Sequence, residues 1–458
     1  MSTTPQTQTQ RTTPPGLGAE RPVAWPARTV RKLVNGLEIV LVELRAFPKI
    51  SAQLFFRSGN AEVAHRSPGL AEMTAAVVRT GTEMRSSRRI EEDLRRIGAD
   101  LGTSSGADTT AISISGLSEF ASELLEIVAD LARNASFPQE EVEREKRQRI
   151  EELKVERATP EFLASERFRR VIFGEHPYAI IAPKEENIRA YRREELIAFY
   201  GAHYVPANGL LVAVGDFRSE EIFDRIEKIF GAWQAPRPAE TARPEPPQHR
   251  GRKIALVHLP EKVQTVILVG NRAITRHSPD WHRLMLANAI FGGAFNSRLV
   301  MNIREQKGYT YSPRSGVTSL RQHGYFSVQA AVRNEVVAAT LTEIFYELDR
   351  MRALPVGEEE LADARNYLSG VFSLGIATQD GILGQLSTVF LEHLPGKYLE
   401  EYRERVRALT ATDVTTAARK YFDSANAQIV VVGDRERIAA QAALFGEITE
   451  YDAQGNRK

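Results

Sequence analysis

Hydrophobic positions along the chain fall into two alternating patterns. Short apolar runs typical of strands occur at residues 37–43 (LEIVLVE), 50–57 (ISAQLFFR), 109–117 (TTAISISGL) and 210–215 (LLVAVG). Between them, apolar residues recur every three or four positions, as on one face of a helix. Leu70, Met73, Val77 and Val78 form one such stripe, which we expect Ser67 to cap and Gly81 to end. The first part of the chain therefore predicts strands interleaved with helices.

The same order of elements recurs in the second part of the chain. Strands are predicted at 253–259 and 265–270, a helix from Ser278 to Gly292, and further strands through Val332. Helices are then predicted at residues 335–352, 357–374, 381–394 and 412–422, before a final strand, AQIVVVG. The runs LLVAVGDF and IVVVGDR end the two parts at matching places. The chain is thus predicted to hold two copies of one α+β unit.

A proline-rich stretch separates the two copies. Residues 234–252 (QAPRPAETARPEPPQHRGR) hold almost no apolar side chain and predict a stiff, exposed linker. We place a disordered arm at residues 1–27, a first domain at 28–233 and a second at 253–450. The expected fold class is α+β, with two homologous domains.

Composition excludes several classes of function. The 60 Lys and Arg residues balance 59 Asp and Glu residues, so no net field favours nucleic acid or an anionic membrane. The chain has no cysteine, which excludes disulfides and thiolate zinc sites, and no apolar run long enough to span a membrane. The first two dozen residues lack the apolar core of a signal peptide. We therefore expect a cytoplasmic protein as the sequence stands, or a periplasmic one if the start is truncated.

The segment 292–316 (GGAFNSRLVMNIREQKGYTYSPRSG) carries the most specific pattern. A Gly-Gly hinge precedes a predicted helix, 297–306, then a glycine stop and a β-prone run, 309–312. Arg304 and Tyr311 stand on either side of this corner. A guanidinium can bind a peptide carbonyl or carboxylate, and a phenol can donate to an oxyanion. The same two residues also suit a helix C-terminal charge and an amphipathic strand position, so the residues alone leave both roles open.

Three motifs together resemble the insulinase/pitrilysin family of zinc metallopeptidases. They are GGAFNSRL and IREQKGYTYS in the second half, and YVPANGLLVAVGDF at the end of the first. The resemblance implies a fold of the mitochondrial processing peptidase type, with two homologous α/β-sandwich-like domains, each a mixed, mostly antiparallel sheet flanked by helices. In this fold two halves or two subunits enclose a chamber. It also implies unfolded peptide substrates that pair with a sheet edge by β-augmentation.

The family's metal motif, HxxEH, is degenerate here. The resemblance places its two histidines and its general base on Glu72, Ala75 and Ala76, and a third ligand on Glu152. Two carboxylates without imidazole make a poor zinc site, and alanine cannot activate water. None of the nine histidines has the spacing to replace the motif. The resemblance therefore implies no metal in this chain and no peptide hydrolysis by the chain alone.

The family's Arg/Tyr pattern falls on Arg304 and Tyr311. In the family this pair contacts substrate carbonyls and stabilises the oxyanion, and some bacterial members place it on a separate subunit from HxxEH. The resemblance thus implies a non-catalytic subunit that supplies Arg304 and Tyr311 in trans to a zinc-bearing homologous partner. Two alternatives stay open: a scaffold or assembly subunit without a catalytic role, and an autonomous hydrolase with a metal at Glu72 and Glu152.

Overall fold

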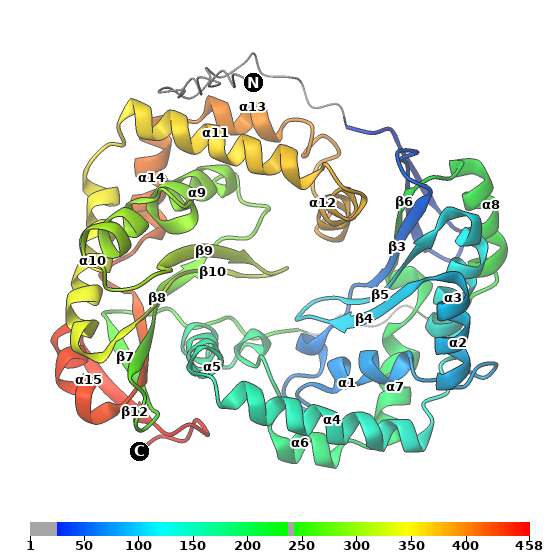
Figure 1. The fold of residues 1–458 in the computed structure, drawn as a ribbon, viewed down its shortest axis with the longest axis horizontal. Helices are drawn as coiled ribbons and strands as arrows, with labels where there is room; N and C mark the ends of the chain where they lie inside the picture. Colours follow the sequence, from blue (N-terminus) through cyan, green and yellow to red (C-terminus); the bar gives the residue numbers. More distant parts are fainter. Residues whose placement is uncertain (1–24, 237–241) are drawn as a thin grey trace, which may run out of the picture.

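The chain folds around two six-stranded sheets, seen in Figure 1 on the two sides of a ring-like ribbon. The structure is a computed structural model that describes residues 25–236 and 242–458. Most of the predicted N-terminal arm, residues 1–24, lies outside the described residues. Within the described part of the chain, no helix is both long and apolar enough to cross a membrane.

The first sheet has the strand order β1-β2-β6-β3-β5-β4. Its strands are β1 (Arg28–Lys32), β2 (Glu38–Glu43), β3 (Lys49–Phe56), β4 (Asp100–Ser105), β5 (Thr110–Leu117) and β6 (Gly209–Gly215). Only β2 and β6 pair in parallel, and all other neighbours are antiparallel. The sheet is therefore mixed and mostly antiparallel, as the resemblance to the peptidase family implied.

The second sheet repeats this arrangement in the order β12-β7-β11-β8-β10-β9. Its strands are β7 (Lys253–His258), β8 (Gln264–Ala273), β9 (Arg314–Ser319), β10 (Gly324–Arg333), β11 (Gln428–Gly433) and β12 (Glu447–Tyr451). The two sheets differ at one edge. There the first sheet ends on β1, antiparallel to β2, whereas the second ends on β12, parallel to β7. The predicted duplication of one α+β unit is confirmed.

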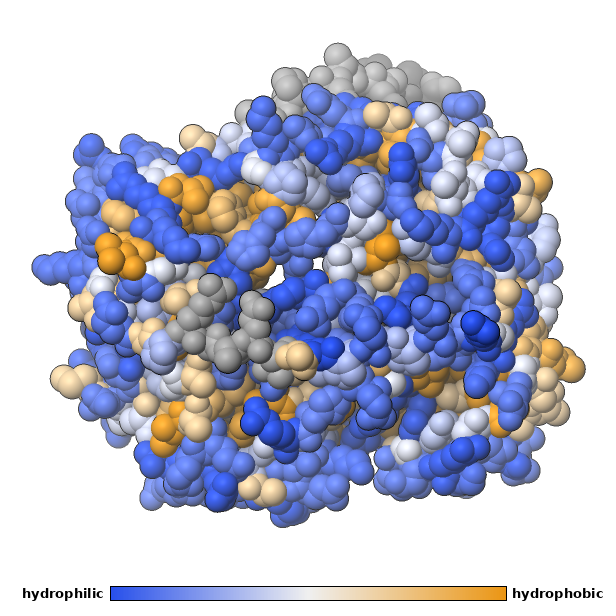
Figure 2. Space-filling model, turned by 180° about the vertical axis from the view of Figure 1, so that it is seen from behind, coloured by the Kyte–Doolittle hydropathy of each residue, from blue (hydrophilic) through white to orange (hydrophobic). Residues whose placement is uncertain are grey.

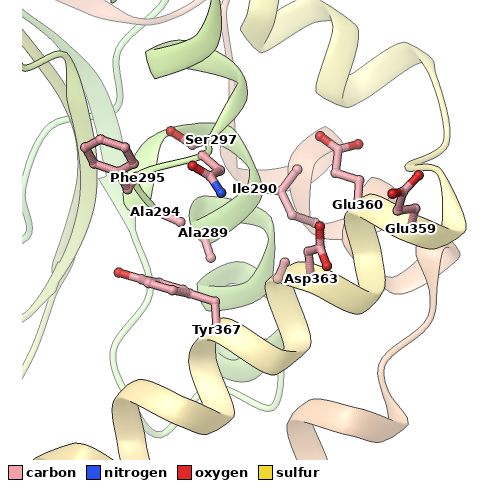
Figure 3. A pocket seen from close by; sticks show the side chains of 11 residues that line it. Ala289, Ile290, Ala294, Phe295, Ser297, Glu359, Glu360, Asp363 and Tyr367 are labelled. Carbon is pink, nitrogen blue, oxygen red and sulfur yellow. The ribbon is translucent and has the colours of Figure 1, made fainter. Parts of the chain in front are cut away.

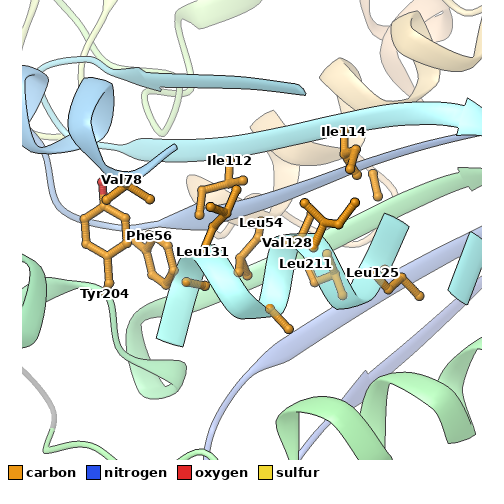
Figure 4. Packing of buried hydrophobic residues seen from close by; sticks show 14 of the residues in the cluster. Leu54, Phe56, Val78, Ile112, Ile114, Leu125, Val128, Leu131, Tyr204 and Leu211 are labelled. Atoms are coloured by element: carbon orange, nitrogen blue, oxygen red, sulfur yellow. The ribbon is translucent and has the colours of Figure 1, made fainter. Parts of the chain in front are cut away.

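Helices pack against both sheets to form two main cores. The helices of the first half are α1 (Leu70–Val78), α2 (Ser87–Ile97), α3 (Ala121–Asn134), α4 (Gln139–Arg157), α5 (Pro160–Phe173), α6 (Glu185–Ala190), α7 (Arg193–His203) and α8 (Ser219–Phe230). Figure 4 shows Leu125, Val128 and Leu131 of α3 packed against Leu54 and Ile112 of the sheet. These side chains are almost fully buried, and their removal from water stabilises this half.

In the second half the helices are α9 (Trp281–Asn288), α10 (Val337–Ala353), α11 (Glu358–Gly375), α12 (Gln379–Leu391), α13 (Tyr402–Ala408), α14 (Ala411–Tyr421) and α15 (Arg435–Ala442). Three aromatic rings mark the centre of this core. Phe326 of β10 stacks on Phe422 with ring centroids 4.5 Å apart, and Phe291 packs against both. Burial of these rings accounts for a large share of the apolar area that this half removes from water.

Each half lends one helix to the other. Helix α5 of the first half packs on β8 and β11 of the second sheet, where Phe168 and Ile172 contact the core that includes Val430. Helix α12 of the second half packs on β3 and β6 of the first sheet, where Leu386 lies in the cluster with Val212. Both helices lie between the two sheets in Figure 1. Strands β6 and β11 are therefore buried on both faces, which explains their uninterrupted apolar sequences.

The structure corrects four details of the sequence-based prediction. Helix α1 begins at Leu70 after Gly69, whose φ of 81° suits glycine, so Ser67 is not its cap. Residues 309–312 form no strand, and β9 begins only at Arg314. The predicted helix after the Gly-Gly hinge is π-helical from Val300 to Gln306. The linker is not exposed throughout, because the Arg243 side chain is only 5% exposed.

Candidate functional site

Helices α1 and α4 bring the degenerate metal-motif positions together. Glu72, Ala75 and Ala76 lie on α1, and Glu152 lies on α4, which packs beside α1. All four positions line one cavity of about 340 Å³, whose other wall is the edge strand β4. The resemblance therefore led to positions that are neighbours in space.

A guanidinium lies between these carboxylates. Arg149 of α4 places its Nε 3.1 Å from Oε1 of Glu72, and its Nη1 lies 4.0 Å from Oε2 of Glu152. The same guanidinium binds Glu156 bidentately, at 3.1 and 3.2 Å. The Arg149 side chain is only 13% exposed, so its positive charge lies close to all three carboxylates and balances part of their negative charge.

Burial raises the pKa of the Glu72 carboxyl above its usual value. Arg149 lowers it, while the negative charges of Glu156 and Glu152 raise it further. Three carboxylates thus share one guanidinium, and Glu72 holds its proton more tightly than a free glutamate does.

This donor set does not fit zinc. Ala75 and Ala76 offer no ligand atom, and the two remaining carboxylates are already paired with Arg149. Among residues 25–236 and 242–458, no cluster of three His, Cys, Asp or Glu side chains is arranged to hold a metal ion. Glu72, Glu152 and Glu156 form an ion-pair cluster around Arg149, and it includes the two glutamates that the resemblance assigned as metal-ligand positions.

Sequence reasoning missed Arg149. Its signal was present, because Arg149, Glu152 and Glu156 recur at three- and four-residue spacing and so share one face of α4. The docking of α4 on α1 then adds Glu72 to that face.

Two buried histidines pack in the core and, among the residues that the structure describes, do not form part of a metal site. His176 is fully buried, and its Nδ1 accepts a hydrogen bond from the backbone N–H of Tyr178. His282 is buried against the rings of Tyr398 and Tyr402. Burial lowers the pKa of each imidazole to about 4, so both are neutral at pH 7.

The second candidate pair, Arg304 and Tyr311, is brought together in space. Gly308, with φ of 62°, ends the π-helical segment and turns the chain back toward Arg304. The Arg304 guanidinium carbon lies 4.6 Å from the centre of the Tyr311 ring and 4.8 Å from that of Phe295. The guanidinium thus lies over two aromatic rings, and cation–π attraction to both stabilises this position.

The exposed side of this pair is open to a ligand. Tyr311 is 79% exposed and Phe295 67% exposed, while Arg304 forms an ion pair with its neighbour Glu305, at 3.0 Å. Phe295 was not singled out from the sequence. Its place after the Gly-Gly hinge could have indicated it, because that turn brings residue 295 back over the following helix.

Two polar contacts fix the corner on the second half. Arg298 binds Glu360 of α11 bidentately, with both distances 2.7 Å, and its side chain is only 10% exposed. Asn302 donates from its amide to Glu343 and Glu347 of α10, each at 2.9 Å. Helices α10 and α11 therefore set the position of the Arg304 segment.

Comparison with known protein families identifies the class of protein that this duplicated fold defines. Residues 39–180 match the family described as "Insulinase (Peptidase family M16)", and residues 190–368 match the "Peptidase M16 inactive domain". The chain belongs to the M16 peptidase family.

Relatives and solved structures agree with this assignment. A protein from Rickettsia bellii named "Uncharacterized zinc protease" is 25% identical over 409 residues, which cover 88% of this chain and 97% of the relative. The crystal structure of a peptidase M16 inactive domain from Pseudomonas fluorescens has a TM-score of 0.83 and 26% identity, over 89% of this chain and 98% of that one. A protease from Helicobacter pylori shares the fold, with a TM-score of 0.82, 19% identity, and coverage of 89% and 100%.

Proposed function

We propose that this chain is the non-catalytic subunit of a heterodimeric zinc peptidase. It binds unfolded peptide and presents Arg304 and Tyr311 to a scissile bond whose zinc and general base belong to a homologous, HxxEH-bearing partner. The chain itself supplies no metal and no hydrolytic base.

The observation that carries this proposal is the pairing of Arg149 with Glu72 and Glu152. The guanidinium stabilises both carboxylates, and a divalent cation would have to displace that positive charge to reach them. Ala75 and Ala76 leave no side chain to activate water. The first half therefore holds these carboxylates in stabilising ion pairs and, among its described residues, has no group placed to activate water. This argues against the alternative of an autonomous enzyme with a metal at Glu72 and Glu152.

The Arg304–Tyr311 arrangement supports a role at the substrate. The Arg304 guanidinium lies against two rings and pairs with Glu305 through its Nε, so its remaining N–H groups can donate to carbonyl oxygens. The phenol of Tyr311 stands beside it in solvent, where it can donate to an oxyanion that forms during attack on a peptide bond. Neither group generates a nucleophile, so both act on a reaction started elsewhere.

The test is metal content and peptidase activity of the purified chain, alone and mixed with an HxxEH-bearing homologue. The expected result is no zinc and no cleavage alone, with chelator-sensitive cleavage on mixing. Stoichiometric zinc or cleavage by the chain alone would overturn the assignment. A stable complex that gains no activity from this chain would favour the scaffold alternative.

A further inference from the structure

A cavity of about 580 Å³ lies beside the Arg304 corner. One wall is a face of α11, and the other is the turn from Ala289 to Ser297 that leads into the π-helical segment. Figure 3 shows its carboxylates gathered at one end, with the rings of Phe295 and Tyr367 at the other. The cavity is therefore acidic at one end and aromatic at the other.

The acidic end carries two unpaired charges. Glu359, Asp363 and Tyr367 recur every four residues and so share one face of α11. The third carboxylate of the cavity, Glu360, is neutralised by its bidentate pair with Arg298. Within the part of the chain that the structure describes, Glu359 and Asp363 have no ion-pair partner.

Phe295 joins this cavity to the candidate substrate site. Its ring lines the cavity and also lies 4.8 Å from the Arg304 guanidinium carbon, which in turn covers the Tyr311 ring. A side chain that enters the cavity would therefore belong to a residue close to the peptide carbonyl at Arg304.

We propose that this cavity is a specificity subsite for an arginine or lysine side chain of the bound peptide. The proposal rests on the peptide-binding function proposed above and adds the chemistry of the residue selected. The aliphatic stem of the basic side chain lies along Phe295 and Tyr367, and its charged head meets Asp363 and Glu359.

The chemistry of the walls selects against other residues. A cation gains both from the faces of the two rings and from the two carboxylates. An apolar side chain would fill the aromatic end but remove water from carboxylates without pairing them. An acidic side chain would face like charge. The preference for a basic residue is electrostatic and should weaken as ionic strength rises.

The experiment measures binding of unstructured fluorescent peptides to the full chain by anisotropy. The peptides are identical except at one central position, which carries arginine, its neutral analogue citrulline, or norleucine. We expect the arginine peptide to bind about fivefold more tightly than the citrulline peptide at low salt. The double variant Glu359→Gln/Asp363→Asn should abolish this ratio.

Two control variants separate this proposal from the function on which it rests. Glu358→Gln removes an exposed charge from the same helix outside the cavity, and the arginine preference should persist. Arg304→Ala should weaken all three peptides alike. Circular dichroism melting curves establish that each variant folds.

Each outcome is decisive. An arginine preference that is lost only in the cavity variant supports the subsite. Equal binding of the arginine and citrulline peptides by the wild-type chain overturns the subsite but leaves peptide binding intact. A preference that survives in the cavity variant also overturns the subsite. Failure of all three peptides to bind overturns the peptide-binding function, and the subsite with it.

Discussion

Arg149 of α4 and Glu72 of α1 meet at 3.1 Å, in a cavity that Ala75 and Ala76 also line. The interaction places a fixed side-chain cation beside a carboxylate that is only partly exposed, at 37%. The pairing offsets part of the cost of removing this carboxylate from water.

Replacement of Arg304 or Tyr311 should lower the turnover of the mixed complex. Arg304→Ala and Tyr311→Phe each remove one donor to the developing oxyanion, for which we expect roughly 10²-fold loss in kcat. Steady-state kinetics with an unfolded peptide substrate measures this loss. Arg314→Ala and Tyr346→Phe remove exposed groups of the same kinds elsewhere in the second half and should leave kcat unchanged. Equal turnover in all four variants would contradict the role of the pair.

Glu72 should make the chain less stable as pH rises. Its pKa is raised in the folded state, so its contribution to stability is fully present below the unfolded pKa of about 4.5 and is lost as pH rises through the folded pKa. Glu72→Gln removes this titration. Urea unfolding at pH 4.5 and pH 7 should therefore show the variant gaining stability relative to wild type at the higher pH.

Glu151→Gln is the matched control, because Glu151 is exposed on α4 and points outside the cluster. If the difference in unfolding free energy between Glu72→Gln and wild type were the same at both pH values, the pKa of Glu72 would not be raised by burial in the folded chain.

His176 should destabilise the chain in acid. Its pKa is lowered to about 4 in the folded state, so its contribution is fully present above the unfolded pKa of about 6.5 and is lost as pH falls toward 4. Between pH 6.5 and pH 5 the expected loss is about 2 kcal/mol. His176→Gln should flatten this part of the stability curve, as measured by urea unfolding. A curve as steep as that of the wild type would assign the acid sensitivity to other groups.

Loss of Arg243 should destabilise the junction between the two halves. Its guanidinium binds Glu62 at 2.6 Å and Asp108 at 3.1 Å, and all three side chains are largely buried. Arg243→Met would leave the two buried carboxylates without their shared cation, with Asp108 held by neutral donors such as the Tyr178 hydroxyl. We expect a cost of about 3 kcal/mol in the free energy of unfolding. Thermal or urea unfolding tests this value.

Arg250→Met serves as its control, since Arg250 lies exposed in the same proline-rich stretch. If the two variants unfolded alike, the Arg243 contacts would contribute nothing measurable to the junction.

Local sequence pattern predicted most strands and helices, because their apolar periodicity reflects burial on one or both faces. It could not predict where α5 and α12 would pack, since each meets a sheet of the other half that is distant in sequence. The continuous apolar runs of β6 and β11 indicated that both faces of each strand are buried. They did not indicate which helix covers the second face.

Some residues of the candidate site could likewise be predicted from the sequence, and others could not. The family motif identified the positions of Arg304 and Tyr311, and the structure brings the two side chains into contact. Spacing along the chain indicates that Arg149 shares a face of α4 with glutamates and that Phe295 follows the hinge. Their contacts with Glu72 and Arg304 depend on how a pair of helices and a turn fold back, which spacing does not determine. The strand expected at 309–312 failed because Gly308 turns the chain and residues 309–312 make no ladder pairs before β9.

Because α5 and α12 each pack on the sheet of the other half, they also determine when each sheet can be fully covered during translation. Strand β6 leaves the ribosome long before α12, so one apolar face of the first sheet stays uncovered until the second half has been nearly synthesised. In the meantime, that face is a surface for chaperones or for aggregation. A chain cut in the linker would leave both pieces with a bare sheet, and their rescue would require the two fragments to be made together.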